Sequence, residues 1–271
     1  RPRVLREAGA AVDGEVRISA LLCRTSDREP QGAEGAQALA GVLGERLGIS
    51  PRVIGSPGEP RDGHWSEDLR ASRGCIMEAG GQVDDALADG VAPIVTASDC
   101  TIAITTIPAV LRHVPDARVL WLDAHGDFNT PDSTPSGFLG GMCLSAACGV
   151  WDAGFEGPRL DPSRVITYGV RDLDGPEQVL LETHGVGRAT RAATLIDALR
   201  GTEVFVHLDC DVLDPELMPA QFPAAGGISD GELSAVLEQL KAECRVVGLE
   251  VTALAGPDRA PLVADCLDGL L

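Results

Sequence analysis

Three potential metal ligands, Asp123, His125 and Asp127, occupy alternate positions directly after an apolar run. The run from Ala117 to Leu122 predicts a buried strand, and alternate residues of an extended segment lie on the same face. Two carboxylates and an imidazole can therefore converge on one point. Side chains of these types bind divalent metal ions that activate water.

A second acidic pair lies 86 residues further on, where the apolar segment Val204 to Leu208 precedes Asp209 and Asp211. A single Asp-x-Asp after a strand is commonly a loop cap. Two such strand ends, one with the pattern Asp-x-His-x-Asp, favour a shared metal site instead. Five donors at two strand ends can hold two divalent ions, with bridging carboxylates and one position open for water.

Cys100 follows a third predicted strand, Ala92 to Ala97, and precedes a predicted helix, Ile102 to Val114. A strand, a short polar elbow and a helix place a functional residue at the carboxyl edge of a parallel sheet. Cys100 is thus a candidate metal ligand, or a nucleophile whose pKa is lowered at a helix start. We favour the ligand, because the base that a nucleophile needs, His125, is better used as a ligand itself.

Apolar runs alternate with segments of helical periodicity over the whole chain, which predicts a mainly parallel sheet with helices on both faces. The predicted strands are 16–23, 53–54, 92–97, 117–122, 165–170, 203–208 and 246–251. The main predicted helices are 35–47, 67–87 with interruptions at Gly74 and Gly80-Gly81, 102–114, 229–242 and 262–271. No linker divides residues 1–271, so we expect a single α/β domain.

The composition, 44% hydrophobic and 23% charged, is typical of a soluble globular protein. A formal net charge of −19 argues against nucleic acid or an anionic membrane as a partner. With no membrane-length apolar run and a polar start, we expect a cytoplasmic protein. The eight cysteines are scattered, most of them in apolar segments, which predicts buried free thiols rather than a disulfide framework.

Two motifs resemble the signatures of the arginase/agmatinase (ureohydrolase) superfamily. They are Asp123-Ala124-His125-Gly126-Asp127 and His207-Leu208-Asp209-Cys210-Asp211-Val212-Leu213-Asp214-Pro215. The resemblance implies a three-layer α-β-α arginase-like fold and a small-molecule substrate, and it is compatible with a homo-oligomer. In that superfamily a binuclear manganese centre activates a hydroxide that attacks a guanidinium carbon. The resemblance therefore implies a metal-dependent hydrolase of the guanidino C–N bond of an arginine-like amino acid.

The resemblance also implies two Mn²⁺ ions, bridged by Asp123 and Asp209. The metal ligands that it implies are Cys100, Asp123, His125, Asp127, Asp209 and Asp211. Asp123 and Asp127 are also the implied catalytic residues.

The substrate contacts carry over from the same resemblance. Asn129, Thr134 and Ser136 fall where arginases hold the α-carboxylate of the substrate, and Asp174 and Glu177 fall where they receive the α-amino group. This pairing favours an amino-acid substrate.

Three positions depart from the superfamily pattern. Cys100 replaces a histidine ligand, and a thiolate is a softer donor than Mn²⁺ prefers, so we expect the second metal site to be weak, altered in identity or empty. Gly140 stands where arginases keep a histidine that shuttles protons, a loss that costs roughly a hundredfold in rate. Ala253 aligns with the glutamate that grips the guanidinium. Either the register shifts so that Glu250 serves, or this grip is absent.

The exchanges at Cys100 and Gly140 resemble most closely the branch that hydrolyses Nω-hydroxy-L-arginine to ornithine and hydroxyurea in the D-cycloserine pathway. Two alternatives stay open. Ala253 and Gly140 also suit hydrolysis of another C–N bond, such as an amide or formimino group. The three exchanges together also suit a protein of this fold that has lost catalysis and acts as a binding partner.

Overall fold

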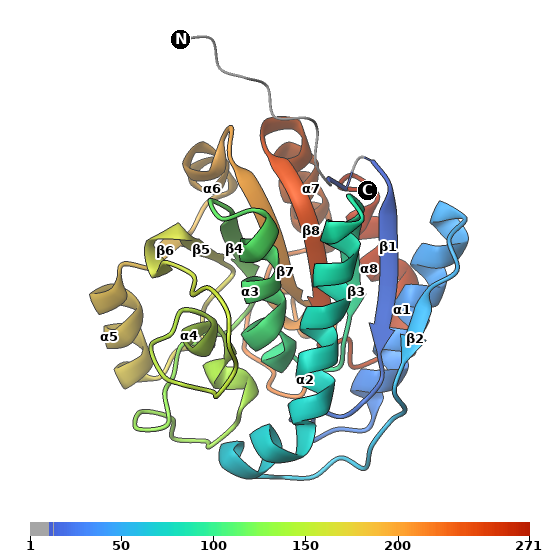
Figure 1. Ribbon diagram of the computed structural model, residues 1–271. Coiled ribbons are helices and arrows are strands. Elements are labelled where there is room, and N and C mark those ends of the chain that lie inside the picture. Colours follow the sequence, from blue (N-terminus) through green and yellow to red (C-terminus); the bar gives the residue numbers. More distant parts are fainter. Residues whose placement is uncertain (1–10, 13) are drawn as a thin grey trace.

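The computed structural model describes residues 11–12 and 14–271 (Figure 1). Within them, eight parallel strands form one sheet in the order β2-β1-β3-β8-β7-β4-β5-β6. The strands are β1 (Val16–Leu21), β2 (Arg52–Ile54), β3 (Ala92–Thr96), β4 (Arg118–Leu122), β5 (Val165–Tyr168), β6 (Gly187–Ala189), β7 (Glu203–Asp209) and β8 (Arg245–Thr252). The helices are α1 (Gln31–Leu47), α2 (Trp65–Ala88), α3 (Ala103–His113), α4 (Cys143–Ala147), α5 (Gly175–His184), α6 (Ala192–Leu199), α7 (Asp230–Glu243) and α8 (Ala260–Leu267). The predicted α/β class and three-layer arrangement are confirmed.

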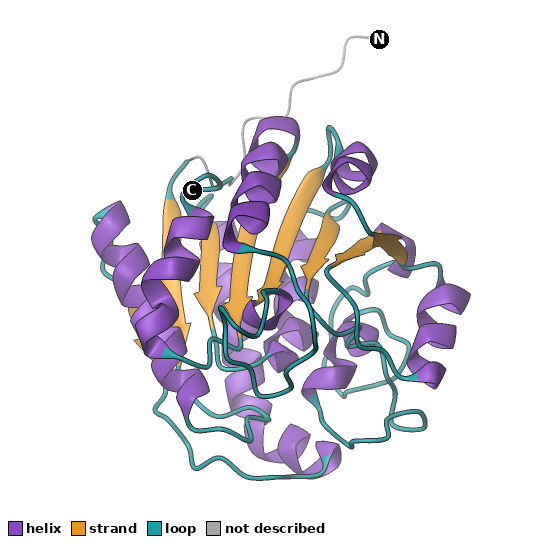
Figure 2. Cartoon of the chain, turned by 180° about the vertical axis from the view of Figure 1, so that it is seen from behind, coloured by secondary structure: helices purple, strands orange, loops and turns teal. Residues whose placement is uncertain are grey.

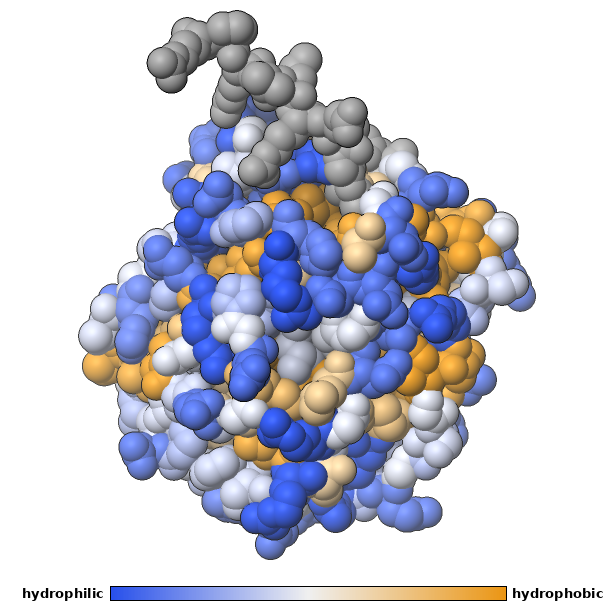
Figure 3. Space-filling view, in the orientation of Figure 1, coloured by the Kyte–Doolittle hydropathy of each residue, from blue (hydrophilic) through white to orange (hydrophobic). Residues whose placement is uncertain are grey.

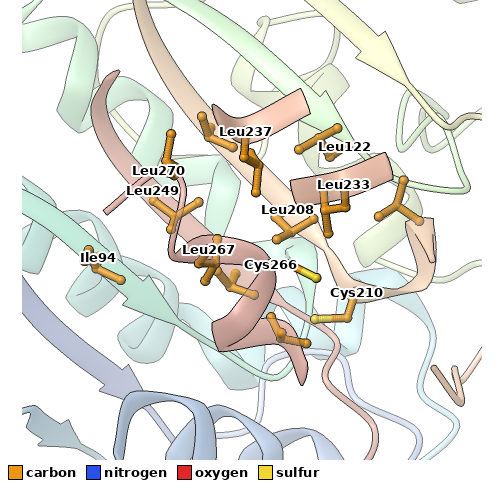
Figure 4. Close-up of a cluster of buried hydrophobic side chains, with 14 of the residues drawn as sticks. Ile94, Leu122, Leu208, Cys210, Leu233, Leu237, Leu249, Cys266, Leu267 and Leu270 are labelled. Carbon is orange, nitrogen blue, oxygen red and sulfur yellow. The ribbon is translucent and has the colours of Figure 1, made fainter. Parts of the chain in front are cut away.

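Helices cover both faces of the sheet, as a parallel sheet requires. Helices α1, α6, α7 and α8 pack on one face, and α2, α3 and α4 pack on the other, which faces the viewer in Figure 1. Leu208 and Leu249 of the sheet pack with Leu237 and Leu267 of the first group (Figure 4). Each buried leucine contributes about 1.5 to 3 kcal/mol. The two apolar cores fix the sheet between the helix layers.

The exterior carries the polar sides of these helices. The face shown in Figure 3 mixes hydrophilic and hydrophobic residues. In the described part of the chain, every helix is too short or too polar to cross a membrane.

Two parts of the helix and strand prediction need correction. Helix α2 runs without interruption through Gly74 and Gly80-Gly81. A Cβ at Gly80 would lie 2.8 Å from Cβ of Thr105, so this glycine allows α2 to approach α3 closely rather than ending the helix. Strand β6 and helix α6 were not expected, because β6 has only three residues at the sheet edge and its central Arg188 is exposed.

The strand order brings the chemically interesting strand ends together. Strands β4 and β7 are neighbours, with Leu122 opposite Leu208, so Asp123 and Asp209 lie side by side. The chain passes from β3 to β4 across β8 and β7, and ligands bind at such a reversal of strand order. The central strands in Figure 2 point toward the lower end of the molecule, where the loops that follow them lie.

One cysteine pair departs from the predicted free thiols. Cys23, just after β1, forms a disulfide with Cys75 of α2, and their Cα atoms are 6.0 Å apart. Beside it, the Arg24 guanidinium lies 2.8 Å from the buried Asp68 carboxylate of α2. The pairing joins segments 52 residues apart, which the spacing of cysteines cannot predict. The other six cysteines are free, and all but Cys244 are buried.

Reduction of this disulfide is expected to lower the free energy of unfolding by about 2 to 4 kcal/mol, because the unfolded chain loses a constraint. Urea unfolding with and without a phosphine reductant measures the change, and Cys75→Ser should show no effect of the reductant. Thiol titration of the unreduced, unfolded protein should find six thiols per chain. Eight thiols would contradict the disulfide.

Candidate metal centre and substrate cavity

A cavity of about 280 Å³ opens at the carboxyl edge of the sheet. All six predicted metal ligands line it: Cys100, Asp123, His125, Asp127, Asp209 and Asp211. Its volume is near the lower end of ligand pockets, about 300 to 1,000 Å³. The structure therefore gathers residues from three strand ends around a space suited to a small molecule.

One group of donors centres on His125. Its Nδ1 lies 3.0 Å from Oδ2 of Asp211 and 3.4 Å from Oδ1 of Asp123. The backbone N–H of Ala124 donates to the other oxygen of Asp211 at 3.0 Å, which fixes that carboxylate. Asp123, His125 and Asp211 thus present three donor atoms within 4.8 Å of one another.

A second group shares Asp123 and centres on Cys100. The Cys100 Sγ lies 2.8 Å from Oδ2 of Asp209 and 3.3 Å from Nε2 of His207. Cys100, Asp123 and His207 again have donor atoms within 4.8 Å of one another. Burial, followed by the Asp209 charge, raises the pKa of the Cys100 thiol well above its usual value. Without a cation, this thiol therefore stays protonated.

The buried carboxylates of the site carry more negative charge than the neighbouring side chains can balance. Burial raises the pKa of Asp127, Asp123 and Asp209, and neighbouring carboxylates raise each further. Burial opposes the charged form of His125, yet bonds to Asp123 and Asp211 raise its pKa to about 12. Burial also acts to raise the pKa of Asp211, but the hydrogen bond and charge of His125, together with the N–H of Ala124, lower that pKa overall. One imidazolium cannot balance four buried carboxylates, so the donor set fits divalent cations.

Two residues at the cavity have strained backbones. Asp127 and Ala253 have φ of 48° and 56°, and no other non-glycine residue in the described chain has a positive φ. Such conformations cost about 1 to 3 kcal/mol and cluster at functional sites. The carbonyl of Asp127 accepts the N–H of Leu144 at 3.1 Å, so the start of α4 holds the strained turn.

Four of the five predicted substrate contacts line the same cavity: Asn129, Ser136, Asp174 and Glu177. Thr134 lies beside the cavity instead, where its Oγ1 accepts the N–H of Gly137 and shapes the turn. Nδ2 of Asn129 donates to Asp174 at 3.2 Å. The backbone N–H of Phe128 donates to Glu177 at 2.8 Å. Burial raises the pKa of Glu177 to about 7, and the Asp174 charge adds to the rise.

The departures from the superfamily pattern also meet at the cavity. A Cβ at Gly140 would lie 2.4 Å from the Phe138 ring, so a histidine fits there only if that ring moves. Ala253 lines the cavity, whereas Glu250 is fully buried within the sheet. The register therefore does not shift, and Glu250 does not reach the cavity.

Two further residues, at the cavity or beside the predicted ligands, were not expected from the sequence. His207 stands two positions before Asp209 on β7, and this alternation was the signal that it shares a face with a ligand. Asp27 lines the cavity from the turn after β1. Burial and the nearby Asp99 carboxylate raise the pKa of Asp27 to about 7. The position of Asp27 directly after a predicted strand was the sequence feature that could have identified it.

Comparisons with known proteins agree with this geometry. Residues 63–259 match the arginase family. The chain is 37% identical over 239 residues to N(omega)-hydroxy-L-arginine amidinohydrolase from Streptomyces lavendulae, covering 86% of each chain. It is 33% identical over 186 residues to arginase from Bacillus caldovelox, covering 61% of each. The solved arginase of Bacillus subtilis superposes with a TM-score of 0.83 at 24% identity, covering 95% of this chain and 98% of that one.

The family match covers most of the chain, and the fold and the donor residues agree with it. The chain belongs to the arginase family and is an amidinohydrolase, a hydrolase that acts on linear amidines.

Proposed function

We propose that this protein hydrolyses the guanidino C–N bond of an arginine-like amino acid, with Nω-hydroxy-L-arginine as substrate. Addition of water across that bond gives ornithine and hydroxyurea. The observation that supports the proposal is that one small cavity is lined both by the buried carboxylates of the candidate metal ligands and by polar groups suited to an amino acid. The similarity to the Streptomyces lavendulae amidinohydrolase supports the hydroxylated substrate.

The cofactor that we propose is a pair of Mn²⁺ ions. Asp123 and Asp209 would bridge them, His125 and Asp211 would complete one site, and Cys100 and Asp127 would complete the other. When bound, two such cations lower the pKa of a water molecule and supply a nucleophile at neutral pH. The catalytic residues in this proposal are Asp123 and Asp127, because both carboxylates line the cavity and would hold the metal that activates the water.

The protein itself would orient the substrate. Asn129 and Ser136 would receive the α-carboxylate, and Asp174 and Glu177 would receive the α-ammonium group. The buried Glu177 is held by the N–H of Phe128, the residue directly after Asp127. This contact would fix the amino-acid end relative to the proposed metal ligands and so direct the guanidino group toward them.

The part of the cavity lined by Ala253 influences which substrate fits. No glutamate reaches the cavity from β8, so the usual grip on a guanidinium is absent. A hydroxyguanidine is less basic than a guanidine, so its amino-acid end can dominate binding. The same observation favours a second candidate reaction, hydrolysis of another C–N bond such as a formimino group.

Manganese-loaded protein is expected to release ornithine from Nω-hydroxy-L-arginine faster than from L-arginine. Asp123→Asn and Asp209→Asn should each lower the rate at least about a hundredfold, because a bridging carboxylate is lost. The exposed Asp89→Asn is the matched control and should keep the wild-type rate. Full activity in both bridging variants would contradict the proposal, and turnover of formimino substrates alone would favour the second candidate.

Removal of divalent cations is expected to destabilise the protein. Without them, the raised pKa of Asp127 and Asp209 gives stability that is present at low pH and lost as the pH rises through the raised values. Metal binding also needs deprotonated ligands. A fixed concentration of Mn²⁺ should therefore raise the Tm more at pH 8 than at pH 6. Where that concentration is a hundredfold above Kd, binding adds about 2.7 kcal/mol to the free energy of unfolding. Equal Tm values in chelator and in Mn²⁺, measured by calorimetry, would contradict the metal centre.

A further inference from the structure

His207 is a buried histidine that the metal set described so far does not use. It lies on β7, its side chain is fully buried, and its ring stacks on Trp121 with centroids 3.5 Å apart and planes at 5°. Side chains two apart on a strand share a face, so His207 points to the same side as Asp209, and Trp121 to the same side as Asp123. The imidazole therefore lies on the same face of the sheet as Asp209, and Trp121, opposite it on β4, donates its Nε1–H to Asp123.

The far side of this imidazole is held by a carboxylate. Nδ1 of His207 lies 2.7 Å from Oε1 of Glu250, its register partner on β8, and both side chains are fully buried. The other oxygen of Glu250 accepts the hydroxyl of Thr106 at 2.6 Å. A neutral imidazole that donates Nδ1–H to this carboxylate leaves its lone pair on Nε2. Metal-binding histidines almost always carry such a partner on the nitrogen that does not bind the metal.

The other ring nitrogen, Nε2, lies beside two of the proposed metal ligands. Nε2 of His207 is 3.3 Å from Sγ of Cys100, and both lie within 4.8 Å of an Asp123 oxygen. Metal–nitrogen and metal–sulfur bonds of about 2.1 and 2.3 Å place two ligands of one ion about 3.1 to 3.6 Å apart. The observed separation falls inside this range.

We propose that His207 is itself a ligand of the ion on the Cys100 side, and that Glu250 orients it. The imidazole absent at position 100 is then supplied from β7, one strand beyond β8. This explains why Glu250 stays in the sheet rather than reaching the substrate. The inference rests on the metal centre proposed above.

This ligand set also makes Co²⁺ a suitable probe ion for the Cys100 side of the centre. A thiolate and an imidazole are softer donors than carboxylates and suit Co²⁺ or Zn²⁺ better than Mn²⁺. The Cys100 side of the centre should therefore bind Co²⁺ more tightly than it binds Mn²⁺. Because Co²⁺ bound by a thiolate absorbs in the near ultraviolet, occupancy of this side can be followed without an activity assay.

The test compares the wild type with His207→Gln, Glu250→Gln and the control His113→Gln, which removes a half-exposed imidazole bonded to Asp84. Each protein is stripped with chelator, loaded with Co²⁺ and dialysed, and ions per chain are counted by mass spectrometry. We expect two ions in the wild type and in His113→Gln, and one in His207→Gln. Glu250→Gln should bind the ion on the Cys100 side about 10- to 100-fold more weakly.

A double variant separates a ligand from a residue that only holds the thiol. If His207 binds the ion, adding His207→Gln to Cys100→Ser should weaken Co²⁺ binding further. No further change, or a His207→Gln protein with two ions and an unaltered cobalt spectrum, would overturn the proposal. Circular dichroism of each stripped protein checks that the fold is kept. A wild type that retains no metal would contradict the metal centre itself, a different failure from that of His207.

Discussion

The structure depends on the burial of four aspartate carboxylates beside one another at one sheet edge. Asp123, Asp127, Asp209 and Asp211 are each at most 6% exposed. Buried charges are stable only when they are paired, and His125 alone supplies too little positive charge. Divalent cations are the compensation that fits both the charge and the donor atoms. A pair of such cations would also supply the activated water that a hydrolase of the arginase family needs.

The turn from Asp127 to Asn129 would link the proposed metal centre to substrate recognition. Asp127 lines the cavity, the N–H of Phe128 donates to Glu177, and Asn129 donates to Asp174, so consecutive residues would serve both ends of the proposed substrate. The strained φ of Asp127 allows this turn. A shift in the turn would therefore disturb binding and chemistry together. Beneath it, His207, Glu250 and Thr106 form a buried polar chain that ties the centre to α3.

Local patterns predicted much of the fold and the donor residues. Apolar runs predicted the buried strands. The alternation of Asp123, His125 and Asp127 predicted that their side chains converge. Features that depend on contacts between distant segments were missed. His207 becomes informative only when β8 places Glu250 opposite it, and the Cys23–Cys75 disulfide needs α2 to lie against the end of β1. Strand β6 was missed because a three-residue edge strand has little apolar surface to bury.

The loop after β4 shows the same limit on a smaller scale. Thr134 and Ser136 differ by two positions, and the motif resemblance treats them alike. In the structure Ser136 lines the cavity, whereas the Thr134 hydroxyl accepts the N–H of Gly137 and closes a turn. Likewise, Gly80 looks like a helix breaker in the sequence, but the contact with Thr105 makes it a packing position. The roles of Thr134, Ser136 and Gly80 cannot be predicted from the residues next to them in the sequence.

The most direct test of the central claim is anomalous diffraction at the manganese edge from crystals soaked in Mn²⁺. The account predicts two peaks about 3.5 to 4 Å apart, the usual spacing of paired catalytic metals, both in contact with Asp123 and Asp209. An absence of peaks among these carboxylates would contradict it, because the buried charges would then be balanced in some other way.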